Sequence, residues 1–89
     1  MKLSKEIKKW HDQIIHNYGI EDDAGLTLCR IAAESFERMK QAQLIIEKEG
    51  LIIEDRFKQQ KCHPAVLIEK DAKNALILAL SKLNLELET

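Results

Sequence analysis

Residues 22–50 of the chain read DDAGLTLCRIAAESFERMKQAQLIIEKEG, the longest stretch with helical periodicity in the sequence. Its apolar residues recur at three- and four-residue steps, which is the spacing of one face of an α-helix. Asp22 or Asp23 can cap the start of the helix, because a carboxylate accepts a hydrogen bond from a free amide of the first turn. Gly50 can end it, because glycine readily takes the backbone conformation of a helix C-terminus. We therefore expect one long helix over about 22–49.

This long helix carries two apolar stripes, which lie on different sides of it. The first contains Ala24, Leu28, Ile31, Ala32, Met39, Ala42 and Ile46. The second, interrupted by Lys40, contains Leu26, Cys29, Ala33, Phe36 and Leu44. A helix in a small monomer usually buries one stripe, so the second stripe must find another partner.

A shorter helix is predicted before the long one, over about 4–17. Its apolar face repeats at helical spacing through Leu3, Ile7, Trp10, Ile14 and Tyr18. Ser4 is a suitable N-terminal cap, and Gly19 is a suitable C-terminal stop.

After the long helix we expect a β-hairpin over about 51–62 and a third helix over about 64–83. Residues 51–53 are apolar and mostly β-branched, residues 55–60 are turn-like, and residues 60–62 can return as a second strand. His63-Pro64 opens the third helix, because proline fits the first helical position. Residues 75–80 are apolar almost all round, so this helix also needs cover on more than one side. The predicted fold class is mainly α, with three helices and a small β-hairpin between the second and third.

The length and composition suit one small domain over residues 1–89. The 89 residues leave no room for a second core, and 45% hydrophobic with 33% charged residues is a folding composition. We find no secretory signal and no apolar run long enough to span a membrane, so no membrane partner is expected. Cys29 and Cys62 form no paired motif. We expect two reduced thiols in a cytosolic protein, one of them buried in a helix.

The sequence offers little that resembles an active site. It has no glycine-rich phosphate loop and no zinc-binding pattern, so we expect no catalytic residue, no metal and no cofactor. Cys62 and His63 could form a thiol–imidazole pair, and an enzyme that uses them stays open as an alternative. Against it, adjacent side chains point in different directions, and His63 has a structural task beside Pro64.

The surplus of apolar helix surface is a stronger signal than any catalytic motif. The residues in question, candidates for an oligomer interface, are Leu26, Phe36, Leu44, Leu67, Ile77 and Leu78. Leaving them in water would forfeit roughly 1.5–3 kcal/mol each, a total on the order of 10 kcal/mol, which is comparable to the stability of a whole domain. Self-association would cover them. The alternative is that the first helix and the hairpin cover them within one chain.

Basic residues form two groups, although the net charge is −1. The first group lies at the start of the chain and contains Lys2, Lys5, Lys8 and Lys9. The second lies in the hairpin and contains Arg56, Lys58 and Lys61. Acidic residues collect elsewhere, for example at Glu86 and Glu88. Surface lysines often serve solubility alone. The alternative is contact with DNA phosphates, which would be weak for one chain and strengthened by avidity in an oligomer.

Several short motifs follow one another along nearly the whole chain. They are YGIED (18–22), AESFER (33–38), EGL (49–51), DRF (55–57), KCHPA (61–65), EKDA (69–72) and LNL (83–85). Their order and spacing resemble the small subunit of phage terminases, with an EGL turn, a DRFG hairpin and a KxHPA helix start. The positions that carry the likeness include Gly50, Asp55, His63 and Pro64.

The resemblance implies a non-enzymatic DNA-packaging subunit in the cytoplasm of a bacterial host, encoded by a phage or prophage. Its implied partners are further copies of itself in a ring, double-stranded viral DNA, and the large ATPase–nuclease subunit that it regulates. Lys58 stands where the family usually has glycine, so the hairpin is expected to be looser or longer. The sequence also lacks the basic arm or tail of longer relatives, so DNA binding is expected to depend on assembly.

A second class of function remains open from the sequence. The basic first helix also suits a small DNA-binding regulator of helix-turn-helix type. However, no short helix-turn-helix spacing appears, and the longest helix has a mixed-charge, two-stripe surface rather than a base-reading one.

Overall fold

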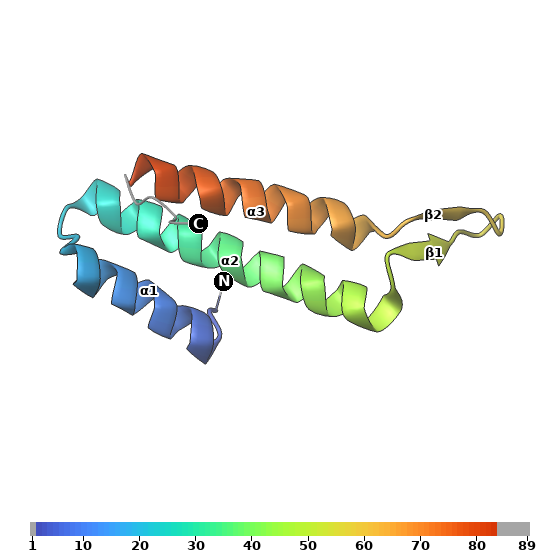
Figure 1. Cartoon of the computed structure of the whole chain (residues 1–89), viewed down its shortest axis with the longest axis horizontal. Coiled ribbons are helices and arrows are strands. Elements are labelled where there is room, and N and C mark those ends of the chain that lie inside the picture. Colours follow the sequence, from blue (N-terminus) through green and yellow to red (C-terminus); the bar gives the residue numbers. More distant parts are fainter. Residues whose placement is uncertain (1, 84–89) are drawn as a thin grey trace.

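The computed structural model describes residues 2–83, which form three helices and one two-stranded hairpin (Figure 1). In chain order these are α1 (Lys5–Tyr18), α2 (Asp23–Glu49), β1 (Ile52–Glu54), β2 (Gln60–Cys62) and α3 (Pro64–Lys82). The predicted fold class is confirmed, with its long central helix and its hairpin between α2 and α3. Glu86, Glu88 and most of the LNL motif lie outside the described residues.

Each helix begins at a side chain that accepts a hydrogen bond from a backbone amide of the first turn. Ser4 caps α1, and Asp22 rather than Asp23 caps α2, where its Oδ2 lies 2.8 Å from the Gly25 amide nitrogen. His63 caps α3, with Pro64 at the first helical position as predicted. Gly19 ends α1 in the left-handed conformation at φ 59°, which glycine adopts without steric cost.

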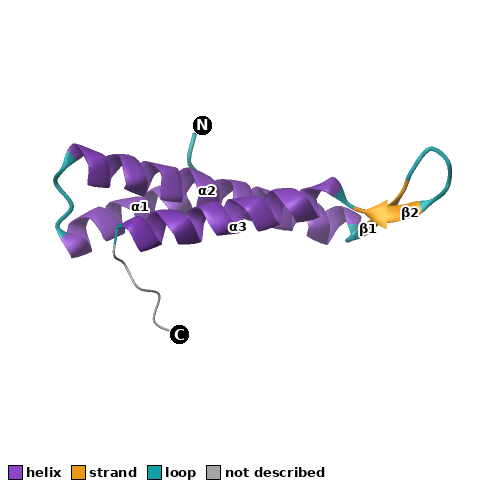
Figure 2. Cartoon of the chain, turned by 90° about the horizontal axis from the view of Figure 1, so that it is seen from above, coloured by secondary structure: helices purple, strands orange, loops and turns teal. Residues whose placement is uncertain are grey.

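Residues of both stripes of α2 contact the other two helices. In Figures 1 and 2, α3 runs along most of α2, whereas the shorter α1 lies along the N-terminal half of α2. Ala32 of the first stripe lies in a buried cluster with Leu76, Ala79 and Leu80 of α3. Phe36 of the second stripe meets Trp10 of α1 edge to face, with ring centroids 5.1 Å apart. The second stripe is therefore partly covered by α1 within the chain, as the single-chain alternative expected. The hairpin, which that alternative also included, projects beyond the helices and does not cover the stripe (Figure 1).

The helices meet through small side chains. The alanines that are buried at these contacts are Ala32, Ala33, Ala42, Ala65, Ala72 and Ala79. Small side chains let helix axes approach closely, but each removes little apolar area from water. Besides these alanines, the buried apolar side chains of the described residues are Ile7, Cys29, Leu76 and Leu80. The interior is therefore built largely from alanine, and many larger apolar side chains remain on the outside.

The hairpin projects from the end of the α2–α3 pair and lengthens the molecule, which measures 52 × 24 × 23 Å (Figures 1 and 2). Its strands are antiparallel, with Ile52 opposite Cys62 and Glu54 opposite Gln60. Asp55 closes the turn, because its Oδ1 accepts hydrogen bonds from the amides of Phe57 (2.8 Å) and Gln59 (3.0 Å).

Lys58 occupies the left-handed region of the backbone map, at φ 61°. Its amide donates to the Asp55 carbonyl oxygen at 2.9 Å, as in a three-residue hairpin loop that ends in a left-handed residue. The expectation of a looser or longer turn was wrong. The turn keeps the geometry that favours glycine, and lysine adopts it at an energetic cost.

Replacing Lys58 with glycine is accordingly expected to stabilise the hairpin by about 1 kcal/mol. The measurement is hydrogen exchange of the Asp55 amide, which donates to the Gln59 carbonyl oxygen at 2.9 Å. This exchange should slow by roughly fivefold if the turn opens less often. Gln59→Gly is the matched control, because only Lys58 and two glycines have positive φ among the described residues. Faster exchange in Lys58→Gly than in the native chain would contradict the prediction.

Candidate nucleic-acid and assembly surfaces

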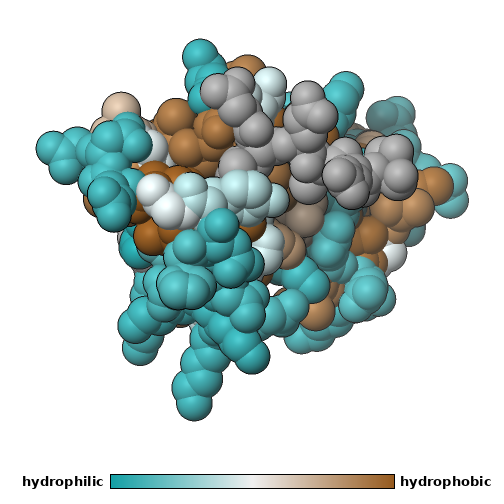
Figure 3. Space-filling view, turned by 60° about the vertical axis from the view of Figure 1, so that its left-hand side comes forward, coloured by the Kyte–Doolittle hydropathy of each residue, from teal (hydrophilic) through white to brown (hydrophobic). Residues whose placement is uncertain are grey.

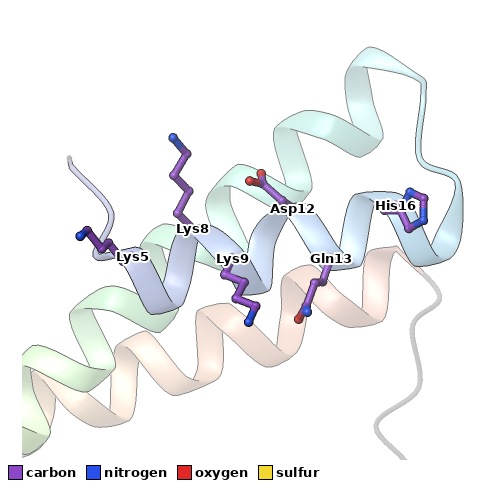
Figure 4. Close-up of a pocket in the computed structure, with 6 residues that line it drawn as sticks. All are labelled: Lys5, Lys8, Lys9, Asp12, Gln13 and His16. Atoms are coloured by element: carbon purple, nitrogen blue, oxygen red, sulfur yellow. The ribbon is translucent and has the colours of Figure 1, made fainter.

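The outer face of α1 is basic. Because Ile7 is buried and Trp10 packs toward α2, helical periodicity places Lys5, Lys8 and Lys9 toward solvent. All three are exposed. Figure 4 shows them along α1 at a shallow depression that Asp12, Gln13 and His16 also line. The structure thus brings these predicted lysines onto one surface.

Arg30 of α2 belongs to the same region, although the sequence reasoning did not select it. It lines a second depression together with Lys2, Lys8, His11 and Asp12. Its guanidinium also lies 3.7 Å from the Glu34 carboxylate one turn further along α2. Only the docking of α1 on α2 brings Arg30 beside Lys2 and Lys8. No signal within either helix alone could have indicated it.

The second basic group lies elsewhere. Arg56, Lys58 and Lys61 are exposed on the hairpin, beyond the end of α2 that α1 does not reach (Figure 1). The Arg56 guanidinium stacks over the Phe57 ring, 4.9 Å from its centroid. The two predicted basic groups therefore do not form one continuous surface in a single chain.

Five of the six residues predicted for subunit contact are exposed. They are Leu26 (36% exposed), Leu44 (64%), Leu67 (63%), Ile77 (45%) and Leu78 (57%). Apolar side chains of similar exposure that the sequence reasoning did not select are Tyr18, Ile31, Ile45, Leu51, Ile52, Phe57 and Ile68. Hydrophobic side chains accordingly reach the surface beside hydrophilic ones in Figure 3.

Leu67 and Leu78 share the side of α3 that faces away from α2. The buried residues of α3, which include Ala72 and Leu76, occupy the opposite side of the helix. Leu67 and Leu78 are three turns apart on one line along the helix. This outward side of α3 has no cover within the described chain.

Phe36 differs from the other five residues that were predicted for subunit contact. It is half-buried, its ring packs against Trp10, and the ammonium of Lys40 lies 5.8 Å from the centroid of that ring. Lys40 also pairs with Glu6 of α1 at 3.7 Å. The structure therefore places Phe36 at the contact between α1 and α2, where its packing serves the fold of the single chain.

Cys29 and Cys62 are both free, one buried and one exposed, as predicted. Burial raises the pKa of the Cys29 thiol, and the nearby Asp22 carboxylate raises it further. Cys29 thus stays protonated at neutral pH and acts as a small packing group.

Both ring nitrogens of His63 are engaged by groups other than the Cys62 thiol. Its Nδ1 accepts from the Ala65 amide at 2.9 Å, and its Nε2 lies 3.3 Å from Glu49 Oε1. The tautomer with hydrogen on Nε2 satisfies both contacts. His63 therefore links the end of α2 to the start of α3, which is the structural task expected beside Pro64.

Within residues 2–83, no group of three or more His, Cys, Asp or Glu side chains is arranged to hold a metal ion. In the same part of the chain, no helix combines the length and apolarity needed to cross a bilayer.

The fold and these surfaces define a small helical protein whose outside is both apolar and locally basic. Comparisons with models of protein families, with curated proteins and with solved structures find no match for this chain.

Proposed function

We propose that this protein is a terminase small subunit, a non-catalytic adaptor that assembles into an oligomer, binds viral DNA and regulates the large packaging subunit. The observation that carries the proposal is the uncovered apolar side of α3, marked by Leu67 and Leu78. The choice of the terminase family rests on the order of the short sequence motifs, which resembles that of its small subunits.

The assembly part rests on the cost of leaving this side of α3, and the exposed Leu44 of α2, in water. Leu67, Leu78 and Leu44 are each more than half exposed. Covering three such side chains stabilises an interface by roughly 4–9 kcal/mol before the entropy of association is subtracted. Exposed apolar patches of this kind typically mark protein–protein contacts, and copies of one chain most often arrange themselves with closed symmetry.

The DNA part rests on the basic face of α1 and its neighbour Arg30. A few phosphate contacts per chain give weak, strongly salt-dependent binding. Repetition of the same face around an oligomer multiplies the contacts with one duplex and raises the overall affinity by avidity. Assembly and DNA binding are therefore coupled in this proposal.

A triple variant, Lys5→Glu, Lys8→Glu and Lys9→Glu, tests the DNA surface. We expect DNA retention at moderate salt to fall at least about tenfold, with a shallower dependence on salt concentration and with unchanged oligomer mass by light scattering. The matched control is Lys70→Glu, Lys73→Glu and Lys82→Glu, which changes the net charge equally through exposed lysines of α3. Equal retention by the native chain and the α1 variant would show that α1 is not the DNA surface.

Light scattering on the native chain tests the assembly itself. A species of ring size is expected, and a monomer over a wide range of concentrations would contradict the proposal. The helix-turn-helix alternative predicts a dimer that binds a palindrome in a salt-resistant way. No feature of the described structure favours it, since α2 has α1 and α3 packed against it.

A further inference from the structure

A groove opens on α2 where α1 begins. The second stripe of α2 continues past the N-terminal end of α1 and loses its cover there, so that Leu44 is 64% exposed. The groove has a volume of about 350 Å³ and is lined by residues of both helices. Leu44 supplies the exposed apolar surface, whereas Ile7 also lines the groove but is buried. Glu6, Glu37 and Glu47 stand around them with Lys40.

The groove is acidic, with three carboxylates against one ammonium group. Glu37 accepts a hydrogen bond from the Ser4 hydroxyl at 2.9 Å, which leaves its negative charge unneutralised. Glu6 pairs with Lys40 at 3.7 Å, but both side chains are well exposed, and such pairs contribute little. Among the described residues, Glu47 has no ion-pair partner. The groove therefore suits an apolar group that carries positive charge.

The tip of the hairpin has this chemistry. Its loop presents Arg56, Phe57 and Lys58, and Phe57 is 69% exposed. The guanidinium of Arg56 lies over the Phe57 ring, so the aromatic group and a cation are presented together. A two-stranded hairpin is marginally stable in water by itself, and an exposed aromatic tip gains stability from a partner. The loop complements the groove in both charge and apolarity.

We propose that the hairpin tip of one copy docks into the acidic groove of a neighbouring copy. Phe57 then packs on Leu44, while Arg56 and Lys58 face the glutamates. The inference rests on the self-assembly proposed above and specifies which surfaces of two neighbouring copies touch. The tip and groove of one chain do not meet, because the hairpin points away from α1 along the long axis (Figure 1).

This contact joins two different surfaces, so it is a head-to-tail contact of the kind that generates rings when the rotation between neighbours closes. It also divides the basic residues between two tasks. Arg56 and Lys58 join subunits, whereas the lysines of α1 remain free to face DNA. The two basic groups are then separated in a single chain because one contacts a neighbouring subunit and the other faces DNA.

Reciprocal charge reversal tests the contact. The tip variant carries Arg56→Glu and Lys58→Glu, and the groove variant carries Glu6→Lys and Glu47→Lys, which leaves Glu37 and its bond to Ser4 intact. Each variant alone is expected to need at least about tenfold more protein to assemble, because like charges meet. An equimolar mixture is expected to assemble as the native chain does, since each reversed tip meets an oppositely charged groove.

The outcomes separate the inference from the proposed function. Helical circular dichroism equal to that of the native chain shows that both variants fold. If native and variant chains assemble alike, or if the mixture does not recover assembly, the docking contact is overturned while self-assembly stands. If the native chain is itself a monomer, both the inference and the proposed function fail.

Cysteine cross-linking gives an independent measurement. In a Cys62→Ser background, Phe57→Cys combined with Leu44→Cys should yield a ladder of disulfide-linked multimers under mild oxidation. The matched control combines Phe57→Cys with Ile31→Cys, because Ile31 is also exposed on α2 but does not line the groove. A ladder of equal strength from the control would overturn the specific docking.

Discussion

Replacing Leu67 and Leu78 with glutamate is expected to convert the assembled protein into a folded monomer. Each leucine is more than half exposed on the outward side of α3, so the change removes little packing from the single chain. At an interface, each replacement loses roughly 1.5–3 kcal/mol of apolar burial and adds a carboxylate that must be desolvated. The combined loss exceeds about 4 kcal/mol, which weakens association by about a thousandfold or more.

The masses of the native chain and of this double variant can be compared by light scattering, and helix content by circular dichroism. Lys73→Glu is the matched control. It lies on the same helix, is exposed, and alters the net charge by the same amount as the two leucine replacements. A double variant that keeps the native mass would show that the outward side of α3 is not a subunit contact.

Replacing Phe36 with alanine is expected to destabilise the single chain by about 3 kcal/mol. The change removes the edge-to-face contact with Trp10 and the packing against the cluster of Ala32, Leu76, Ala79 and Leu80. For a domain of this size, such a loss lowers the melting temperature by roughly 12–24 °C. Because α1 docks on α2 through this pair, α1 should detach first.

Thermal unfolding in the Leu67→Glu/Leu78→Glu background measures this effect without a contribution from assembly. The chain has only two phenylalanines, and Phe57→Ala is the matched control because Phe57 is 69% exposed on the hairpin. The control should unfold at nearly the same temperature as its background. If the Phe36→Ala variant also unfolds at the temperature of its background, the ring of Phe36 does not stabilise the single chain.

These two predictions divide the large apolar residues into two sets with different tasks. Phe36 and Trp10 stabilise the single chain, whereas Leu67 and Leu78 are available to neighbours. The division follows from the alanine-rich interior. Six alanines occupy the helix contacts beside only a few larger side chains such as Ile7, Leu76 and Leu80, so most leucines and isoleucines of α2 and α3 lie on the outside.

The sequence by itself determined the elements and their ends. Ser4, Asp22, His63-Pro64 and the glycines act within one or two turns of their own position, so their effect is local. The hairpin also followed from local signals, although the positive φ of Lys58 did not, because lysine has no preference for that conformation. Each of these features depends on neighbours along the chain.

Which residues of α2 are covered, and how far that cover extends along the helix, depends on how the three helices pack together. The covered part of the second stripe stops at the N-terminal end of α1, which places Phe36 inside the chain and leaves Leu44 outside. The same docking brings Arg30 beside Lys8, and Glu6 beside Glu37 and Glu47, to form the acidic groove. Periodicity reports the direction of a side chain around its own helix, but the partner in that direction depends on helix length and packing.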